Sequence, residues 1–295
     1  MEKILVTGAN GQLGNSIKEL ISKSNFDHYH FDFVDLNEIN LADESAIRTY
    51  FSKHHFTAVL NCAAYTAVDL AETETEICYK INADAVGIIA QECKKQNALL
   101  IHISTDYVFS GNGISPYLPE NETDPQNIYG KSKLLGEKLA FENNPKTIVI
   151  RTAWVYSPYG KNFVKTMKFL FENKEEISVV ADQKGIPTLA IDLAEAMLTI
   201  LESKKEIYGV YHYTNANQTD WFEFATEIKN ALAEKIAPET LKIQKINAIS
   251  TAEYPTPAQR PMYSVLDLAK IQNDFNVKVY DWKESLHKMF KNSDI

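Results

Sequence analysis

Short apolar runs alternate with amphipathic segments through the first half of the chain, and this alternation restricts the fold more than any other feature. Buried strands are predicted at residues 3–8, 28–35, 57–64, 98–106 and 146–155. Between them, apolar residues recur at helical spacing, as at Leu13, Ile17 and Leu20. Strands joined by helices need crossover connections, which produce a parallel sheet covered on both faces. The pattern therefore predicts an α/β fold with a doubly wound parallel sheet of the Rossmann type.

A glycine-rich turn follows the first predicted strand. Gly8, Gly11 and Gly14 form the pattern G-x-x-G-x-x-G within TGANGQLG. One glycine permits a tight turn, another lets the backbone approach a pyrophosphate, and a third lets the next helix pack closely on the sheet. Ordinary turn chemistry is the alternative, but the position between a strand and a helix favours dinucleotide binding.

An acidic residue at the end of the second predicted strand is expected to bind the adenosine ribose. Asp35 is the better candidate and Asp32 the alternative, and either could instead cap the loop. A carboxylate there repels a 2′-phosphate and so favours NADH over NADPH, although the cofactor prediction remains NADH or NADPH. Asn40 and Leu41 are expected beneath the adenine. The small side chains of Ala63–Ala64, after the third predicted strand, let the backbone approach the cofactor, or simply pack well.

Polar side chains end the fourth predicted strand, where open α/β sheets bind their ligands. Ser104 closes the strand or takes part in the site, and Asp106 binds a ligand hydroxyl or caps a turn. Further on, Tyr129 and Lys133 are four residues apart in IYGKSKLLGEK, which places them one helical turn apart on one face. By itself this spacing also fits an exposed amphipathic helix. The order of the motifs instead favours a shared site at the strand end, with Thr105 included.

The chemistry that suits these side chains is ketone reduction, which needs a hydride on carbon and a proton on oxygen. A neighbouring ammonium lowers the pKa of a phenol and brings it closer to the range where acid–base catalysis works at neutral pH. We therefore predict that Tyr129 gives the proton, that Lys133 lowers the pKa of Tyr129 and holds the nicotinamide ribose, and that Thr105 binds the carbonyl oxygen.

The second half of the chain is less regular and predicts a smaller unit. A strand running into a loop is expected at 177–188, a strand at 209–215, and helices at 191–203 and 221–235. We expect an NAD(P)-binding Rossmann domain at 1–157, to which 179–213 return. The remaining segments, 158–178 and 214–295, are expected to form an α+β substrate domain.

Charge and cysteine content exclude several classes of function. The net charge of −9 gives no support for nucleic-acid binding. No run approaches the roughly 18 apolar residues of a membrane span, and the first strand begins too early to leave room for a signal peptide. Cys62, Cys78 and Cys93 match neither a zinc site nor a disulfide framework. We expect a soluble cytoplasmic protein that binds neither nucleic acid nor membrane.

The motifs together resemble the extended short-chain dehydrogenase/reductase superfamily and, within it, the reductases that complete dTDP-L-rhamnose synthesis. General motifs of the superfamily are TGANGQLG (7–14) and NIYGKSKLLGEK (127–138), and more specific ones are RTAWVYSPYGKNFVKTM (151–167), ADQKGIPT (181–188) and AEYPTPAQRP (252–261). The motifs NCAAYTAVDLAE (61–72) and STDYVFSG (104–111) also match. The resemblance implies NAD(P)H-dependent reduction of the C4 ketone of dTDP-4-dehydro-L-rhamnose to dTDP-L-rhamnose.

The resemblance also implies which residues form the site. The cofactor would contact Gly11, Gln12, Leu13, Ala64, Tyr65, Thr66, Ile103, Tyr129 and Lys133. The sugar nucleotide would lie against Thr66, Val68, Thr105, Asp106 and Trp154. Independently, an indole at Trp154 follows a strand end and can pack against a sugar, or belong to the core. Arg260 can pair with the diphosphate, or be an ordinary surface arginine.

One residue departs from the family pattern. Some relatives form dimers bridged by magnesium, with an acidic ligand just after the last glycine of the turn, where this chain has Asn15. We therefore expect no metal, and either a monomer or a different homodimer. Two alternatives to the reductase remain: a reductase or epimerase for another nucleotide sugar, and a non-catalytic regulatory subunit with the same fold.

Overall fold

Six parallel strands form the central sheet in the computed structural model, which describes residues 1–237 and 240–293. They are β1 (Glu2–Thr7), β2 (Tyr29–Val34), β3 (Ala58–Asn61), β4 (Leu99–Thr105), β5 (Thr147–Thr152) and β10 (Gly209–His212). Their order across the sheet is β10-β5-β4-β3-β1-β2. The strand order reverses between β1 and β3, and ligands of open α/β sheets bind beyond the carboxyl ends of the strands at such a reversal. The predicted doubly wound parallel sheet is confirmed.

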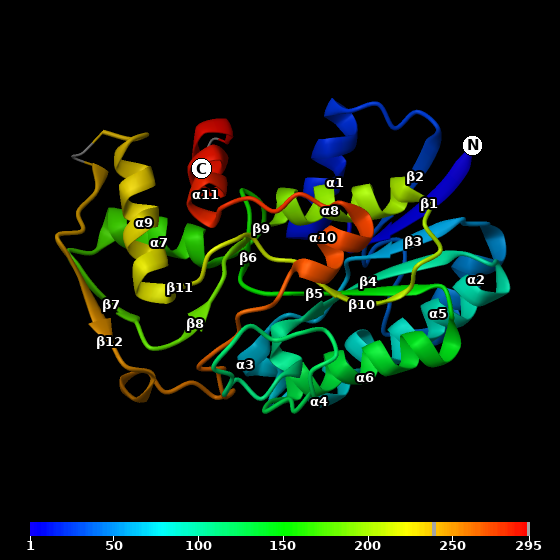
Figure 1. Cartoon of the computed structure of the whole chain (residues 1–295), viewed down its shortest axis with the longest axis horizontal. Coiled ribbons are helices and arrows are strands. Elements are labelled where there is room, and N and C mark those ends of the chain that lie inside the picture. The colour runs from blue at the N-terminus through cyan, green and yellow to red at the C-terminus, as the bar shows by residue number, and fades with distance from the viewer. Residues whose placement is uncertain (238–239, 294–295) are drawn as a thin grey trace.

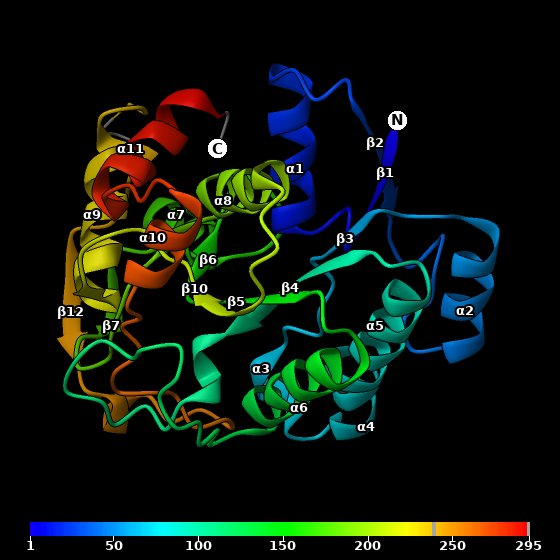
Figure 2. The same cartoon turned by 45° about the vertical axis from the view of Figure 1, so that its right-hand side comes forward.

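Helices cover both faces of this sheet (Figure 1). On one face lie α1 (Gln12–Lys23), α8 (Ala190–Ser203) and α10 (Ala269–Phe275), with α1 packed on α8. On the other lie α2 (Glu44–Lys53), α5 (Ala85–Lys95) and α6 (Ile128–Asn143), with α5 packed on α6. Figure 2 shows the same two layers from a second direction. Each face has its own apolar core, and both cores hold the carboxyl ends of the strands in fixed positions.

A second group of elements lies at one end of the sheet (Figures 1 and 2). Here β7 (Glu176–Val180) pairs with β12 (Lys245–Ile249), and three helices surround a separate apolar core: α7 (Phe163–Asn173), α9 (Trp221–Ala233) and α11 (Trp282–Asn292). Two short strand pairs complete the group, namely β6 (Val155–Tyr156) with β9 (Thr188–Leu189), and β8 (Lys184–Gly185) with β11 (Thr219–Asp220). The exact boundary between two domains stays a prediction.

The segment between β3 and α5 is helical but irregular. It contains α3 (Val68–Ala71), α4 (Thr75–Tyr79) and one π-helical turn, η1 (Lys80–Asp84). Elsewhere in the described residues, a 3₁₀ turn, η2 (Asp106–Val108), lies directly after β4, and another, η4 (Thr251–Glu253), lies after β12. Single π turns within helices occur often at functional sites. In residues 1–237 and 240–293, no helix has both the length and the apolar character that crossing a bilayer requires.

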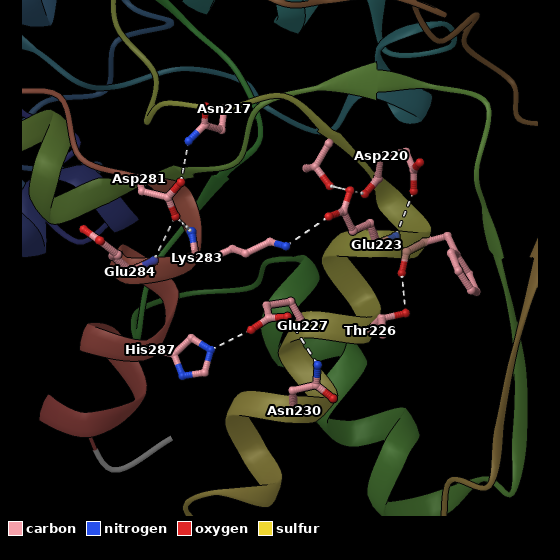
Figure 3. Close-up of polar contacts among 12 residues, drawn as sticks. Asn217, Asp220, Glu223, Thr226, Glu227, Asn230, Asp281, Lys283, Glu284 and His287 are labelled. Atoms are coloured by element: carbon pink, nitrogen blue, oxygen red, sulfur yellow. Dashed lines mark hydrogen bonds and ion pairs between the residues drawn. The ribbon is translucent and has the colours of Figure 1, made fainter.

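Polar side chains join α9 to α11 (Figure 3). The Nε2 atom of His287 lies 2.7 Å from Glu227 Oε1, and its Nδ1 atom lies 3.2 Å from Glu234 Oε2. The hydrogen bond with Glu227 raises the pKa of His287, the bond with Glu234 adds to the rise, and partial burial opposes it. Because the folded state binds the proton more tightly, the contact stabilises the fold fully below the ordinary histidine pKa. The stabilisation is lost as pH rises through the folded-state pKa.

Glu227→Gln should therefore destabilise the protein in a pH-dependent way. We expect the free energy of unfolding to fall by about 0.5 kcal/mol at low pH, because the contact is partly exposed, and to change little at high pH. Urea denaturation near pH 6 and pH 9 measures both values, with Glu122→Gln in an exposed loop as the control. An equal loss at the two pH values would contradict the assigned role of His287.

Candidate functional site

The glycine-rich turn borders a cavity of about 190 Å³ at the carboxyl ends of β1 and β3. Six residues predicted to bind the cofactor line this cavity: Gly8, Asp35, Asn40, Leu41, Ala63 and Ala64. They come from three separate loops, which the strand order brings together at the reversal point of the sheet. The size and lining suit the adenosine half of a dinucleotide, and the binding role of the six residues stays a prediction.

Close backbone packing explains two of the glycines. Gly8 has a φ of +66°, and a Cβ there would lie 2.8 Å from the Ala63 backbone. A Cβ on Gly14 would lie 2.7 Å from the Cα of Ala9, so this position lets α1 pack against the turn. Gly11 is the N-cap of α1 and provides no side-chain cap. The first N–H groups of the helix are therefore available to an anion.

The two candidate aspartates have different surroundings. Asp35 borders the cavity, and its carboxylate accepts hydrogen bonds from the backbone N–H groups of Asn10 and Leu36, both at 2.8 Å. It thus holds the glycine-rich turn and also caps the loop after β2. Asp32 lies within β2, where it pairs with Lys3 at 2.9 Å and accepts a hydrogen bond from Tyr50. Of the two, only Asp35 faces the cavity.

Other predicted site residues lie outside the lining of this cavity. The Gln12 side chain joins the start of α1 to the segment after β6, because its Oε1 atom accepts hydrogen bonds from Ser157 at 2.9 Å and Asn162 at 3.0 Å. Leu13 is buried in the apolar core. Thr66 is exposed in the loop before α3, and Val68 begins that helix.

Asn82, on the π turn η1, is a residue that the sequence analysis missed. Its side-chain amide bonds to both backbone groups of Tyr65, accepting from N–H at 2.8 Å and donating to C=O at 3.0 Å. It also donates to Ser132 Oγ at 3.1 Å, beside Lys133 on α6. The fully buried Asn82 therefore fixes the loop after β3 relative to the helix that carries Tyr129 and Lys133. A single asparagine within a helix gives no sequence signal of this role.

The predicted catalytic residues meet at the end of β4. Thr105 is the last residue of β4, and Tyr129 and Lys133 lie on the first turns of α6. The Asn127 side chain caps this helix by accepting a hydrogen bond from Gly130 N–H at 2.8 Å. Lys133 is only 1% exposed, and its Nζ donates to the carbonyl of Ile103 at 2.6 Å. The structure thus places all four predicted residues, Ile103 included, at one strand end.

Burial dominates the pKa values here and overturns one expectation. It raises the pKa of Tyr129 above its ordinary value, and hydrogen bonding with Thr105 opposes this only in part. It also lowers the pKa of Lys133 to about 8. The prediction that Lys133 lowers the pKa of Tyr129 is wrong in this structure, because its ammonium is bonded beneath the strand end and Lys133 is not among the charges that shift the phenol. Tyr129 is therefore fully protonated at neutral pH, as a proton donor must be.

Asp106 stands next to Thr105 and is 2% exposed. The Thr105 hydroxyl donates to its Oδ1 at 2.9 Å, whereas its Oδ2 has no partner among the described residues. Burial raises the pKa of Asp106 to about 6, although the hydrogen bond with Thr105 opposes the rise. A buried polar atom without a partner is unusual, and it suits a carboxyl group that receives a ligand hydroxyl.

Trp154 follows β5 and is held in a rare conformation. Its φ is +48°, a region that bulky residues seldom adopt and that is associated with functional sites. The indole stacks on Trp221 with centroids 3.6 Å apart and planes 13° apart. Gly185 lies against the edge of the indole, because a Cβ there would be 2.6 Å from two of its carbons. The aromatic pair was not predicted, since its members are far apart in sequence.

Arg260 is held by an acidic residue on α3. Its Nη2 pairs with Asp69 Oδ2 at 2.7 Å, and the other carboxylate oxygen accepts from the backbone N–H of Ala258 at 3.2 Å. Its Nη1 is buried and has no partner among the described residues. Arg260 borders a small cavity together with Tyr107. It is therefore not an ordinary surface arginine, and one of its nitrogens is available for a further acceptor.

Ser104 belongs to the structural support of the site. Its hydroxyl donates to Glu137 on α6 at 2.5 Å, and Glu137 pairs with Arg151 on β5 at 2.7 Å. The two charged side chains are 3% and 4% exposed. This buried ion pair joins β4, β5 and α6 directly below the strand ends.

Asn15, which stands where some relatives have an acidic metal ligand, makes ordinary contacts at the start of its helix. The Asn15 side chain donates to the carbonyl oxygens of Asn10 and Gly11, both at 2.9 Å. In the described part of the chain, no group of three histidine, cysteine or acidic residues is arranged to hold a metal ion. The expectation that the protein uses no metal stays a prediction.

Comparison with known proteins gives matches along the whole chain. The family model of the RmlD substrate binding domain matches residues 1–295. A dTDP-4-dehydrorhamnose reductase of Aggregatibacter actinomycetemcomitans is 38% identical over 97% of both chains. The crystal structure of a dTDP-4-dehydrorhamnose reductase from Clostridium acetobutylicum is 37% identical, with a TM-score of 0.91 over 98% of both chains. One from Bacillus anthracis, in complex with NADP, is 36% identical, with a TM-score of 0.90 over 99% of both chains.

Proposed function

The chain belongs to the RmlD substrate binding domain family, and from this premise we infer its reaction. It catalyses the NAD(P)H-dependent reduction of the C4 ketone of dTDP-4-dehydro-L-rhamnose, which gives dTDP-L-rhamnose. The observation in the structure that best supports this function is the meeting of Thr105, Tyr129 and Lys133 at the end of β4. This strand lies beside β3, whose following loop lines the cavity at the glycine-rich turn.

The site fits a dinucleotide. The turn allows close backbone approach at Gly8, the start of α1 offers free N–H groups, and the cavity lies where the adenosine half would bind. When bound, the reduced nicotinamide supplies the hydride that the ketone carbon takes up. Asp35 would hold the adenosine ribose, while Tyr65 and Thr66 would line the path toward the nicotinamide. Lys133 would hold the nicotinamide ribose from beneath.

The proton and the position of the ketone come from this chain. Tyr129 is protonated at neutral pH and would give its phenolic proton to the ketone oxygen as the alcohol forms. Thr105, whose hydroxyl donates to Asp106 in the free protein, would turn that hydrogen toward the same oxygen and polarise the carbonyl.

The remaining residues would bind the sugar nucleotide. Asp106 has a free buried oxygen for a sugar hydroxyl, and the partly buried Trp154 would pack against the sugar. Arg260 offers Nη1 to the diphosphate. Thr66 and Val68 would lie near the nucleotide at the rim of the site. These assignments rest on the positions of the residues and on the family.

The test is an assay with dTDP-4-dehydro-L-rhamnose and reduced nicotinamide. We expect stoichiometric oxidation of NADH or NADPH and formation of dTDP-L-rhamnose, identified by mass spectrometry and NMR. An epimerase would return the hydride and oxidise no added cofactor, and a regulatory subunit would bind the cofactor without turnover. Either result would replace the proposed reaction.

Gly185→Ala should weaken sugar-nucleotide binding selectively. The new methyl group would lie 2.6 Å from the Trp154 indole and 2.9 Å from Ser264 Oγ, so the indole must move. Such overpacking typically costs 1–3 kcal/mol, and we expect KM for the sugar nucleotide to rise about 10-fold. The Kd for NADH should stay unchanged, and Gly87→Ala on α5 is the matched control. An unchanged KM would contradict the role of Trp154.

The cytoplasmic location, the lack of nucleic-acid and membrane partners, and the choice between monomer and homodimer stay proposals. The division into domains at 1–157 with 179–213, and 158–178 with 214–295, is likewise proposed. In support of it, β10 (Gly209–His212) pairs in the central sheet. β7 (Glu176–Val180), which spans the proposed boundary at residue 178, pairs with β12.

A further inference from the structure

A histidine lies directly behind Lys133. The Nζ atom of Lys133 is 3.3 Å from His102 Nε2, in addition to its hydrogen bond with the Ile103 carbonyl. His102 is fully buried, and Lys133 is 1% exposed. Among the ion pairs of the described residues, none includes Lys133. The buried amine therefore depends on two neutral groups, a carbonyl and an imidazole.

A row of buried polar groups continues from His102 across the sheet. Asn61, at the end of β3, has its side-chain nitrogen 3.0 Å from His102 Nδ1. The Thr7 hydroxyl, at the end of β1, donates to Asn61 Oδ1 at 2.6 Å and accepts from Ala63 N–H at 3.3 Å. Each member is at most 1% exposed, apart from Ala63 at the end of the row. The row thus ties Lys133 to the glycine-rich turn.

An imidazole suits this position because it can serve either form of an amine. A neutral imidazole carries one N–H donor and one acceptor nitrogen, and the two exchange between tautomers. An ammonium at Lys133 needs an acceptor at Nε2, whereas a neutral amine there can accept from Nε2–H. The amide of Asn61 offers both a donor and an acceptor to Nδ1, and the Thr7 hydroxyl can turn to match. As placed, the amide nitrogen of Asn61 faces Nδ1 and leaves Nε2–H for a neutral amine at Lys133. With the amide turned over, its oxygen accepts from Nδ1–H and Nε2 accepts from the ammonium.

Of the two buried groups, Lys133 and not His102 changes its protonation state in the pH range of the assay. Burial and the charge on Lys133 hold the pKa of His102 well below its ordinary value, so the imidazole stays neutral. Burial lowers the pKa of Lys133 to about 8, against the opposing effects of Glu137 on α6, Cys78 on α4 and Cys62 after β3. These are the titratable groups that face the amine.

We propose that His102, backed by Asn61, is a positioning residue that holds Lys133 in place and supports it in both protonation states. The proposal rests on the proposed function. The ketone carbon takes up the hydride, and the ketone oxygen takes the proton of Tyr129. Solvent then returns a proton to the phenolate. At high pH, the neutral amine of Lys133 accepts a hydrogen bond from Nε2–H.

Two substitutions test the roles of the two imidazole nitrogens separately. The amide of His102→Gln reaches the position of Nε2 and keeps a partner for Lys133, whereas the amide of His102→Asn reaches only the position of Nδ1 and keeps the contact with Asn61. We measure the Kd for NADH by fluorescence, and kcat with the sugar nucleotide, from pH 6 to 10 in both variants. Lys133→Met has no amine to titrate. Any decrease in NADH binding or turnover at high pH that is caused by the amine should therefore be absent from this variant.

We expect His102→Asn to move the loss of NADH binding and of turnover about one pH unit lower, because an ammonium that loses a hydrogen-bond acceptor gives up its proton more readily. His102→Gln should stay within a few tenths of a unit of the unmodified protein. If His102→Asn does not fold, His102→Glu should move the loss to higher pH, because a carboxylate favours the ammonium.

The proposal is overturned if His102→Asn and His102→Glu leave the pH profile unchanged. It is also overturned if His102→Asn and His102→Gln shift the pH profile equally while both lower Tm. The profile of NADH binding needs no sugar nucleotide. Absence of turnover in the unmodified protein would therefore refute the proposed reaction and leave the test of His102 intact.

Discussion

Replacing Tyr129 with phenylalanine should lower kcat by about 10²- to 10⁴-fold and leave the Kd for NADH nearly unchanged. The hydroxyl is the only group that the change removes, and the ring itself is kept in place by an edge-on contact with Tyr107, with centroids 5.6 Å apart. Steady-state kinetics and fluorescence titration with NADH measure the two quantities. Lys133→Ala, in contrast, should impair both, because Lys133 would hold the nicotinamide ribose and so set the position from which the hydride is transferred.

Tyr107→Phe is the matched control for this experiment. It removes a hydroxyl from the ring that packs against Tyr129, without touching the proposed proton donor. We expect its effect on kcat to be at least tenfold smaller than that of Tyr129→Phe. Turnover of Tyr129→Phe equal to that of the unmodified protein would refute the role of this phenol.

Breaking the buried ion pair beneath the site should produce the largest loss of stability. Glu137→Leu leaves the guanidinium of Arg151 buried without its carboxylate, and such a change typically costs about 3–5 kcal/mol. Arg151 would keep only its hydrogen bond to the Pro119 carbonyl at 3.1 Å and its position over the Phe109 ring. The Ser104 hydroxyl would lose its acceptor as well. Urea denaturation followed by circular dichroism measures the change in the free energy of unfolding.

The double variant Glu137→Leu/Arg151→Met tests the cause of that loss. Replacing both charges with apolar side chains of similar size removes the uncompensated charge, and such replacements are often neutral or stabilising. We therefore expect the double variant to be more stable than Glu137→Leu alone. If it is less stable, the ion pair contributes mainly through direct attraction, and the explanation based on an unpaired buried charge is wrong.

The sequence was sufficient to predict the sheet and part of the site because the relevant signals are local. The apolar runs and the glycine-rich turn specify β1, α1 and the order of crossovers, and Tyr129 and Lys133 fall on one face of a helix whatever surrounds it. Once the strand order is known, the loops after β1, β2 and β3 must meet. That rule alone places the six predicted residues around the cavity.

What could not be predicted depends on contacts between distant segments. Asn82, His102 and Asp69 are single polar residues within helices or strands, and only the packed structure shows which backbone groups or side chains they reach. The direction of the Tyr129 pKa shift was wrong for the same reason. Sequence spacing places an amine near the phenol, but burial and the hydrogen bond to the Ile103 carbonyl decide where its charge acts.

The stacked indoles give the protein an optical reporter of its own. The chain has three tryptophans, of which Trp282 is buried in the core, while Trp154 and Trp221 lie parallel in van der Waals contact. Two indoles so close couple their electronic transitions and should give a paired band of opposite signs in circular dichroism. Any movement of α9, which begins at Trp221, relative to the sheet would change that band. Opening and closing around a ligand could thus be followed without a label.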